Sequence, residues 1–301
     1  MTCLTTAEAF AAYEAARARM PEAAIGKPAP RYIRSLEEIA DQFDVFLLDA
    51  FGVLNIGETA ISGVPERVRD LKAAGKRVFV LSNAASVPRE ALLTKYRHLG
   101  YDFEDKDVIT SRMAAIAGMK SAPDLRWGVM GLAEVSMTDF GPMDWQLLGD
   151  DPEPYESAEG FLLVGSGDWS EQRQALLERS LKNTPRPVRI ANPDIIAPRE
   201  RGFTTEPGYF AHRIAQHTDA ELEFFGKPFP SIYTLAFERL GATDRSRIVM
   251  VGDSLHTDVL GAQSAGISSV LISDFGFFAG QDTAKAIRRS GIIPDFIAPR
   301  P

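Results

Sequence analysis

Short apolar runs that each end in polar residues are the feature that most constrains how this chain can fold. DVFLLD covers residues 44–49, RVFVLSN covers 77–83 and RIVMVGD covers 247–253. None of these runs alternates apolar and polar residues, which is typical of strands covered on both faces of a parallel sheet. Segments with helical periodicity separate the runs, so the chain predicts a repeated strand–helix order.

The spacing of apolar residues also predicts where the helices lie. The expected helices cover residues 35–42, 62–75, 87–100, 231–241 and 257–266. Ser62 is the expected N-terminal cap of the second helix, and Val87 is the expected start of the third. Strands that alternate with helices in this way predict an α/β fold with a Rossmann-like parallel sheet.

The middle of the chain has a different character. Residues 116–223 contain many turn residues, together with strand-like segments such as FLLVG and VRIAN. We therefore expect an inserted second domain of mixed α/β type there. The core domain would consist of residues 35–115 and 224–301, preceded by a helical N-terminal extension over residues 1–34.

Composition narrows the expected partners and location. The net charge of −8 and the pI near 5.2 disfavour a nucleic-acid binder, which normally has a basic face. Cys3 is the only cysteine, so no intrachain disulfide can form, and a cytoplasmic location is expected. No apolar run reaches the roughly 18 residues of a membrane span, and the N-terminus lacks the apolar core of a secretory signal. We expect neither a nucleic-acid nor a membrane partner.

Charged residues follow several of the predicted strands. Asp49 follows the first strand, Asp253 follows the late strand, with Asp258 five residues on, and Lys227 lies in the loop FFGKPFP. Ligands of open parallel sheets bind at the carboxyl ends of the strands, so these groups are expected at one site. A carboxylate can attack phosphorus, provided that cations offset the repulsion between the two anions. Lys227 and a Mg²⁺ ion held by Asp49 and Asp253 would supply that positive charge.

Hydrogen-bond donors follow the second strand. Ser82 and Asn83 end RVFVLSN, where they are expected to contact phosphoryl oxygens. Each of these features has an ordinary structural explanation on its own, because polar residues are common in turns after strands. Their joint occurrence at one sheet edge favours a shared site.

The first two motifs resemble those of the haloacid dehalogenase-like hydrolase superfamily. LLDAFGVL resembles the first motif, which implies that Asp49 is the nucleophile and that the carbonyl of Phe51 is a metal ligand. VLSNAAS resembles the second motif, which implies that Ser82 and Asn83 contact phosphate.

The third and fourth motifs can be matched in the same way. FFGKPFP resembles the third motif, which implies a charge-neutralising role for Lys227. MVGDSLHTDV resembles the fourth, which implies that Asp253 is a ligand of Mg²⁺ and that Asp258 supports it at the metal site. The resemblance covers the chain from about residue 35 onward and leaves the N-terminal extension unassigned.

The long insertion is similar to the large α/β cap of one branch of this superfamily. That branch includes nucleotide, pyridoxal-phosphate and phosphoglycolate phosphatases. IANPDIIAPRE looks like its NPD segment, which implies that Asn192 and Asp194 face the cleft from the cap. The resemblance further implies a small phosphorylated metabolite as the substrate and homodimerisation through the cap.

Phe51 departs from the pattern of this family. Phosphatases of the family usually carry a second Asp there, which protonates the leaving group and then activates water. Such help is typically worth about 10²–10⁴-fold, and a phenyl ring cannot exchange a proton. His256, Glu58 and Glu206 are the alternative proton donors that the sequence suggests, although His256 is better interpreted as a neutral loop residue.

Three functions therefore remain open from the sequence. The favoured one is a Mg²⁺-dependent phosphatase that works through an aspartyl phosphate on Asp49. The second is a dehalogenase-type hydrolase, whose leaving halide needs no proton, but Asp253 and Asp258 preserve a metal-type motif and the large cap is untypical of that class. The third is a catalytically weak protein that binds a phosphorylated ligand.

Overall fold

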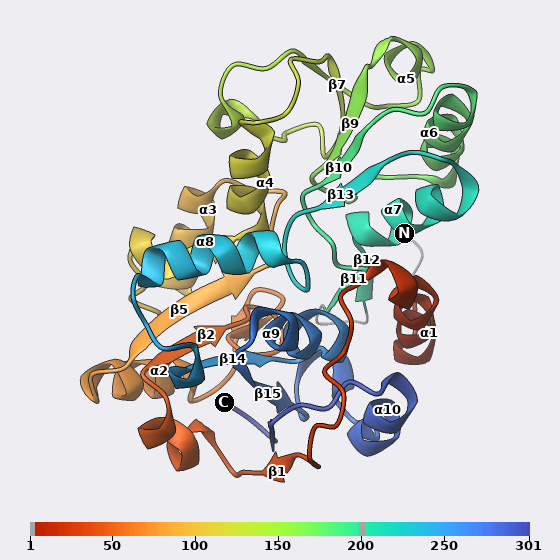
Figure 1. The fold of residues 1–301 in the computed structure, drawn as a ribbon. Coiled ribbons are helices and arrows are strands. Elements are labelled where there is room, and N and C mark those ends of the chain that lie inside the picture. Colours follow the sequence, from red (N-terminus) through yellow and green to blue (C-terminus); the bar gives the residue numbers. More distant parts are fainter. Residues whose placement is uncertain (1–3, 199–202) are drawn as a thin grey trace.

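A seven-stranded parallel sheet forms the centre of the larger half of the molecule (Figure 1). The computed structural model describes residues 4–198 and 203–301, so Cys3 lies outside the described residues. The strands lie in the order β1–β16–β15–β14–β2–β5–β6, and each neighbouring pair is parallel. They are β1 (Arg31–Tyr32), β2 (Val45–Leu48), β5 (Arg77–Ser82), β6 (Val108–Thr110), β14 (Ile248–Gly252), β15 (Ser268–Ile272) and β16 (Phe296–Ala298).

Helices cover both faces of this sheet, because successive side chains of a strand point to opposite faces. Phe46 and Leu48 of β2 pack on one face with α2 and α3, whereas Val45 and Leu47 pack on the other with α4, α8 and α9. The helices of this half are α2 (Val64–Ala73), α3 (Arg89–His98), α4 (Ser111–Met119), α8 (Pro230–Leu240), α9 (Leu260–Ala265) and α10 (Thr283–Ser290). The predicted Rossmann-like α/β fold is confirmed.

A second parallel sheet forms the other half, drawn above the first in Figure 1. Its order is β13–β10–β9–β7–β8, with helices packed on it. The strands are β7 (Trp127–Met130), β8 (Trp145–Leu147), β9 (Gly160–Leu163), β10 (Val188–Ile190) and β13 (Leu222–Phe224), and the helices are α5 (Glu153–Ser157), α6 (Glu171–Asn183) and α7 (Pro207–His217). This sheet and its helices lie in the segment where the sequence predicts an inserted α/β domain, and they are called the cap below.

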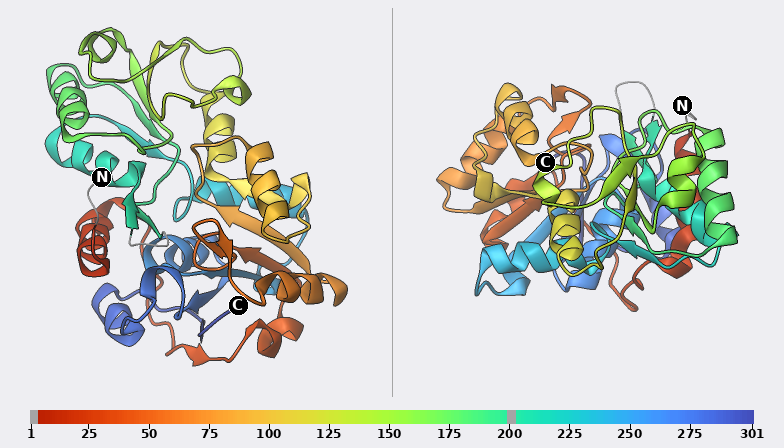
Figure 2. Two further views of the ribbon diagram at one scale, coloured as in Figure 1. Left: turned by 180° about the vertical axis from the view of Figure 1, so that it is seen from behind. Right: turned by 90° about the horizontal axis from the view of Figure 1, so that it is seen from above.

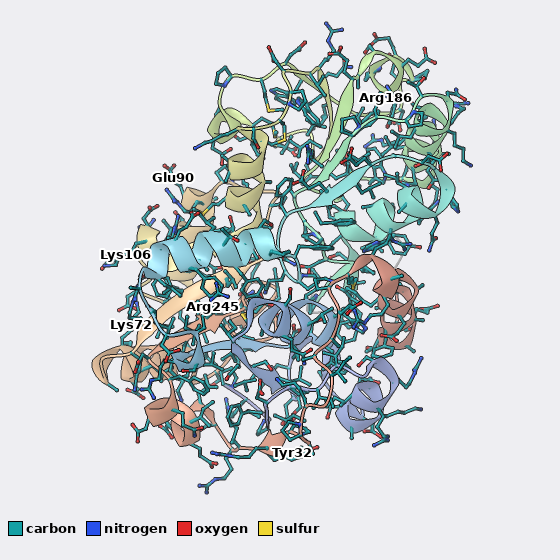
Figure 3. All side chains as sticks on the ribbon, viewed as in Figure 1. Tyr32, Lys72, Glu90, Lys106, Arg186 and Arg245 are labelled. Carbon is teal, nitrogen blue, oxygen red and sulfur yellow. The ribbon has the colours of Figure 1, made fainter. Side chains whose placement is uncertain are left out.

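Two small antiparallel pairs complete the sheet structure. They are β3 (Asn55–Ile56) with β4 (Thr59–Ala60), and β11 (Ile196–Pro198) with β12 (Phe203–Thr205). The second pair extends from the cap toward the core, on the same side as α1 (Thr6–Ala16; Figures 1 and 2). Exposed side chains such as Tyr32, Glu90 and Lys106 lie on the outside of the molecule (Figure 3).

The N-terminal helix α1 (Thr6–Ala16) lies beside both halves, as the two views in Figure 2 show. Phe10 and Tyr13 of α1 share an apolar cluster with Ile195 of the cap and Phe277 of the core. Thr6–Ala16 of the expected N-terminal extension is thus helical, and this helix contacts both halves. No helix of the described residues is long and apolar enough to span a bilayer.

Several predicted helix boundaries were wrong. Residues 36–42 form a 3₁₀ helix, and α2 is capped by Gly63, whose φ of +83° suits a residue without a Cβ, instead of by Ser62. The third helix begins at Arg89 instead of Val87, because Pro88 has extended φ and ψ angles. The segment after β14 begins as a π-helix over Leu255–Val259, before α9.

Candidate active site

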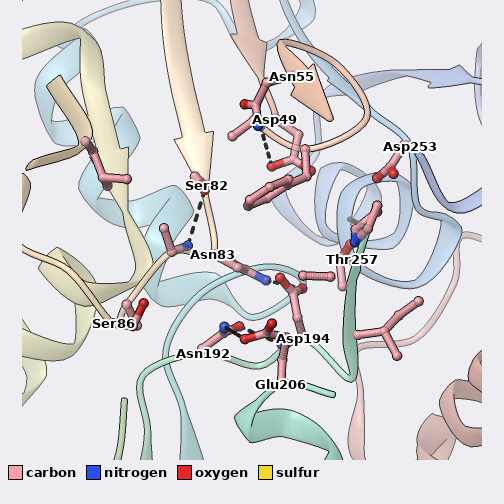
Figure 4. A pocket seen from close by; sticks show the side chains of 18 of the residues that line it. Asp49, Asn55, Ser82, Asn83, Ser86, Asn192, Asp194, Glu206, Asp253 and Thr257 are labelled. Atoms are coloured by element: carbon pink, nitrogen blue, oxygen red, sulfur yellow. Dashed lines mark hydrogen bonds between the residues drawn. The ribbon is translucent and has the colours of Figure 1, made fainter. Parts of the chain in front are cut away.

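The carboxyl ends of three neighbouring strands face the cap. Asp49 follows β2, Ser82 ends β5 and Asp253 follows β14. Lys227 reaches the same edge from the loop between β13 and α8. In Figure 4, Asp49, Ser82 and Asp253 lie in the upper part of the view, and the segment that carries Asn192 and Asp194 lies below them. The structure thus brings together side chains that are far apart in the sequence.

Three carboxylates and one ammonium form the charged centre of the site. Asp49, Asp253 and Asp258 each place an oxygen within 4.8 Å of the other two. Lys227 Nζ lies 2.7 Å from Oδ1 of Asp49 and 2.7 Å from Oδ1 of Asp258, and its side chain is only 2% exposed. One cation therefore neutralises part of a cluster of three acids.

Backbone amides hold each carboxylate in place. The N–H of Ala50 donates to Asp49 Oδ1 at 2.7 Å, and the N–H of Phe277 donates to Asp253 Oδ2 at 2.7 Å. Ser254 N–H donates to Asp258 Oδ2 at 3.0 Å. Oδ2 of Asp49 and Oδ1 of Asp253 have no hydrogen-bond partner among the described residues, so these two oxygens are available to a ligand.

Glycines let the backbone approach this cluster. A Cβ on Gly52 would lie 2.3 Å from Asp253 Oδ2, and one on Gly276 would lie 1.8 Å from the same oxygen. Both glycines have positive φ angles, of 74° and 67°. The resulting cradle of hard oxygen donors fits a Mg²⁺ ion, which prefers carboxylates, carbonyls and water. Asp49, Asp253, Asp258 and the Phe51 carbonyl are the groups that would hold it.

Burial and charge shift the pKa values of these groups. Burial raises the pKa of Asp49 to about 6, although Lys227 opposes the shift. Burial and the neighbouring Asp258 raise the pKa of Asp253 well above its usual range. Burial alone would lower the pKa of Lys227, but Asp258 and Asp49 outweigh this effect and raise it. The ammonium of Lys227 is therefore charged at neutral pH. One ammonium does not balance the charge of three carboxylates.

Asn83 links the core, the lysine loop and the cap. Its Oδ1 accepts a hydrogen bond from Lys227 N–H at 2.7 Å. Its Nδ2 donates to the Lys227 carbonyl at 2.9 Å and to Asp194 Oδ1 at 2.8 Å. Ser82 lies beside it, and its Oγ accepts a hydrogen bond from Ala84 N–H at 3.2 Å. The phosphate contacts expected of Ser82 and Asn83 stay predictions, and Asn83 has a clear positioning role.

The cap closes the site over a cavity of about 310 Å³. Asn192, Asp194 and Glu206 line the cavity from the cap, as Figure 4 shows, opposite Asp49. Asn192 Oδ1 accepts a hydrogen bond from Asp194 N–H at 3.0 Å, and its Nδ2 donates to Glu206 Oε2 at 3.2 Å. Burial raises the pKa of Asp194 to about 8. The structure thus places the two predicted cap residues at the cleft.

Phe51 lies two residues after Asp49, in the segment that follows β2. Its ring lines the cavity and lies below Lys95, whose Nζ is 5.1 Å from the ring centroid. Lys95 Nζ also donates to Glu58 Oε1 at 2.7 Å. Lys95 and the Phe51 ring thus form a cation–π pair on this wall of the site. Residue 51 contributes no acid there.

His256 does not face the cavity, so the suggestion that it replaces the missing acid was wrong. Its ring is buried and stacks on Tyr13, with 4.9 Å between the centroids, and its Nε2 lies 2.6 Å from Glu14 Oε1. Burial lowers the pKa of His256. The interpretation as a loop residue was wrong as well, because His256 belongs to the π-helix and anchors the N-terminal helix.

Sequence reasoning missed Tyr13, which lines the cavity from outside both predicted domains. Tyr13 Oη accepts a hydrogen bond from Ile195 N–H at 3.1 Å, next to Asp194. Asn55 and Thr257 also line the cavity, and Asn55 Oδ1 is buried with no hydrogen-bond partner among the described residues. No motif marked the tyrosine, because its place depends on contacts with residues about 180 positions away.

The fold and the site define a class of hydrolases of α/β fold with an acidic cluster at the edge of a parallel sheet, facing a second α/β half. A family model for haloacid dehalogenase-like hydrolases matches residues 46–138, and a second one, described as HAD-hydrolase-like, matches residues 224–299. The chain is also similar to glycerol-3-phosphate phosphatase of Gallus gallus, with 31% identity over 84% of this chain and 88% of that protein. The chain belongs to the haloacid dehalogenase-like hydrolase family, as the sequence predicted.

Other relatives match over most of their length. Acid sugar phosphatase of Staphylococcus aureus is 24% identical over 85% of this chain and 94% of that protein. A crystal structure of a possible sugar phosphatase from Cytophaga hutchinsonii superposes with a TM-score of 0.77 at 23% identity. That match covers 89% of this chain and 97% of the other, so the likeness extends through both halves of the fold.

Proposed function

We propose that this protein is a Mg²⁺-dependent phosphohydrolase that acts on a small phosphorylated metabolite through an aspartyl phosphate on Asp49. The phosphatase class is supported by the names of the curated relatives, which also favour a polyol or sugar phosphate as the substrate. The cavity of about 310 Å³ suits a ligand of that size.

The observation that carries this proposal is the uncompensated charge beside Asp49. Asp49, Asp253 and Asp258 carry three negative charges when ionised, and Lys227 returns one positive charge, so the cluster has a net charge of −2. A phosphate ester is itself an anion, and like charges this close repel strongly at low dielectric constant. A divalent cation bound to the carboxylates would offset this repulsion.

Each residue then has a defined task. Asp49 is the nucleophile, held by the Ala50 amide with its second oxygen directed away from that bond. Lys227 keeps Asp49 and Asp258 in place and lowers the charge that the phosphate meets. A bound Mg²⁺ would polarise the phosphoryl group. Ser82 is expected to donate a hydrogen bond to the phosphoryl group.

We further propose the domain division at residues 34/35, 115/116 and 223/224, with the segment 116–223 as the cap. The second sheet, β7 to β13, lies within these bounds except for Phe224, the last residue of β13. A cytoplasmic location and a homodimer formed through the cap are also part of the proposal. The single cysteine supports the first, and similarity to the family supports the second.

A phosphate-release assay tests the proposal. Glycerol 3-phosphate and a panel of sugar phosphates are incubated with the protein, with Mg²⁺ or with excess chelator. We expect release only with Mg²⁺ and none from Asp49→Asn, which keeps the shape of the side chain and loses the nucleophile. Release that persists in the Asp49→Asn variant or in chelator would refute the proposed chemistry. Halide release from haloacids in chelator would instead indicate the dehalogenase.

A further inference from the structure

The proposed reaction lacks a proton donor at the usual position. In an in-line displacement at phosphorus, the leaving oxygen lies opposite the nucleophile. The nucleophile Asp49 is at the core side of the cavity, so the leaving oxygen points away from it, toward the cap. Phe51 offers no proton, and an alkoxide is a poor leaving group without one. The donor must therefore be sought on the cap side of the cavity.

Asp194 is the acid that the cap presents there. Its side chain lines the cavity opposite Asp49 (Figure 4). Oδ1 accepts the hydrogen bond from Asn83 Nδ2 at 2.8 Å, whereas Oδ2 has no hydrogen-bond partner among the described residues. A proton on Oδ2 would thus be free to move to a ligand in the cavity.

The backbone around Asp194 is held from two sides. Its own N–H donates to Asn192 Oδ1 at 3.0 Å, and the next N–H, that of Ile195, donates to Tyr13 Oη at 3.1 Å. Ile195 is buried. Contacts from the cap, the N-terminal helix and the core therefore orient one carboxyl group, as preorganised catalysis requires.

The other acids near the cavity are committed elsewhere. Glu58 pairs with Lys95, and its side chain is 76% exposed. Glu206 accepts hydrogen bonds on both oxygens, from Asn192 on one and from Thr204 Oγ1 at 2.8 Å on the other. His256 lies behind Tyr13 and outside the cavity lining.

We propose that Asp194 is the general acid and base of this enzyme and performs from the cap the proton transfers that Phe51 cannot. This inference rests on the proposed phosphatase function and identifies the residue that completes it.

The proposed reaction has two steps, and Asp194 transfers one proton in each. Asp49 attacks phosphorus, the bond from phosphorus to the ester oxygen breaks, and its electron pair goes to that oxygen, which takes the proton of Asp194. The alcohol then leaves. Water attacks the phosphorus of the aspartyl phosphate and gives a proton to the Asp194 carboxylate. The bond to Asp49 breaks, phosphate is released, and both carboxyl groups return to their starting states.

The electrostatic surroundings support a protonated Asp194 at neutral pH. Burial raises its pKa to about 8, and the charges of Asp49 and Glu206 add to the shift. Lys227 and the hydrogen bond from Asn83 act in the opposite direction. Tyr13, which also faces this carboxyl, has a pKa raised well above 10 by burial and is neutral.

The test compares two esters that differ in their need for a proton. p-Nitrophenolate is acidic enough to leave unprotonated, whereas the alkoxide of glycerol 3-phosphate is not. In the Asp194→Asn variant, we expect turnover of glycerol 3-phosphate, or of the best alkyl substrate in the panel, to fall about 10²–10⁴-fold. With p-nitrophenyl phosphate, we expect a burst of one nitrophenolate per enzyme and then slow turnover, because water is no longer activated.

The burst should be accompanied by a trapped aspartyl phosphate. This intermediate would not accumulate if Asp194 had only a structural role. Mass spectrometry of the quenched Asp194→Asn variant should find a phosphoryl group on Asp49. The exposed cap residue Asp168, which pairs with Arg173, supplies the matched control: Asp168→Asn should leave both substrates unaffected.

If the wild-type enzyme is active, any of three results would overturn the inference. They are unchanged alkyl turnover in Asp194→Asn, loss of the burst together with turnover, or a burst in Glu206→Gln instead. If wild type releases no phosphate, the proposed function itself has failed. Should Asp194→Asn not fold, the wild-type pH profile decides. Turnover of the alkyl ester should fall as pH rises through the pKa of Asp194. Release of nitrophenolate in a single turnover should stay constant over the same pH range. If the two rates fall together, the proposal is refuted.

Discussion

Replacement of Lys227 by methionine removes the one ammonium that the described residues place against the acidic cluster. Lys227 Nζ contacts Asp49 and Asp258 at 2.7 Å each, and the side chain is 2% exposed. Methionine has a similar length and fills the same volume without charge. The substitution therefore tests charge compensation with little change in packing.

The expected loss of stability is about 3–5 kcal/mol, the usual cost of leaving a buried charge without its partner. The loss is present in full at pH 7. The folded-state pKa of Lys227 is raised above the unfolded value of about 10.4, so its contribution to stability disappears only as pH rises through the folded-state pKa. Activity should be lost as well, because Asp49 and the phosphate then meet without the ammonium.

Denaturant unfolding at pH 7 measures the change, with chelator present so that no divalent cation replaces the missing charge. Lys106→Met is the matched control, because Lys106 forms an ion pair with Glu104 in which both side chains are mostly exposed. Such pairs contribute little, and we expect no measurable change there.

A double-mutant cycle shows whether charge is the cause. Asp258→Asn, added to Lys227→Met, removes the stranded carboxylate and should restore part of the stability, with a coupling energy of about 1–3 kcal/mol. If the Lys227→Met variant is as stable as the wild type, or if the coupling energy is near zero, Lys227 does not stabilise this site electrostatically.

Three other contacts have measurable consequences for stability or for metal binding. Tyr13→Phe leaves the buried Ile195 N–H without an acceptor, so stability in denaturant should fall by about 1–3 kcal/mol; an unchanged midpoint contradicts this. Gly52→Ala puts a Cβ 2.3 Å from Asp253 Oδ2 at a φ of +74°, and Mg²⁺ affinity measured by calorimetry should fall about 10–100-fold, whereas equal affinity would speak against the proposed cradle. Burial lowers the pKa of His212 to about 3, so the unfolded chain binds a proton that the folded one rejects, and wild-type stability should fall as pH falls from about 6.5 to 3. His212→Phe should flatten that part of the profile, and an unchanged slope would show that another group causes it.

The order of elements was predictable from local pattern. Continuous apolar runs such as residues 45–48 form strands covered on both faces, and a parallel sheet necessarily brings their carboxyl ends to one edge. The convergence of Asp49, Ser82 and Asp253 could therefore be inferred without coordinates. Helix starts were less predictable, because Ser62 and Gly63 are both acceptable caps and the choice depends on backbone geometry.

The placement of the cap over the core was beyond the reach of sequence patterns. The hydrogen bond from Asn83 to Asp194 joins residues 111 positions apart, and that from Ile195 to Tyr13 joins residues 182 apart. His256 illustrates the difficulty, because the sequence placed it beside a catalytic motif while packing turned its ring toward Tyr13 and Glu14.

The amino-acid sequence by itself determined the family and the alternation of strands and helices along the chain, and it marked Asp49 as the candidate nucleophile, because these depend on periodicity and on residue types at strand ends. Tertiary structure alone decided that Tyr13 of the N-terminal helix lines the cavity and that Asp194 faces Asp49 across it. The physical reason is that the direction of a side chain on a separate domain depends on packing between distant segments, which no local pattern encodes.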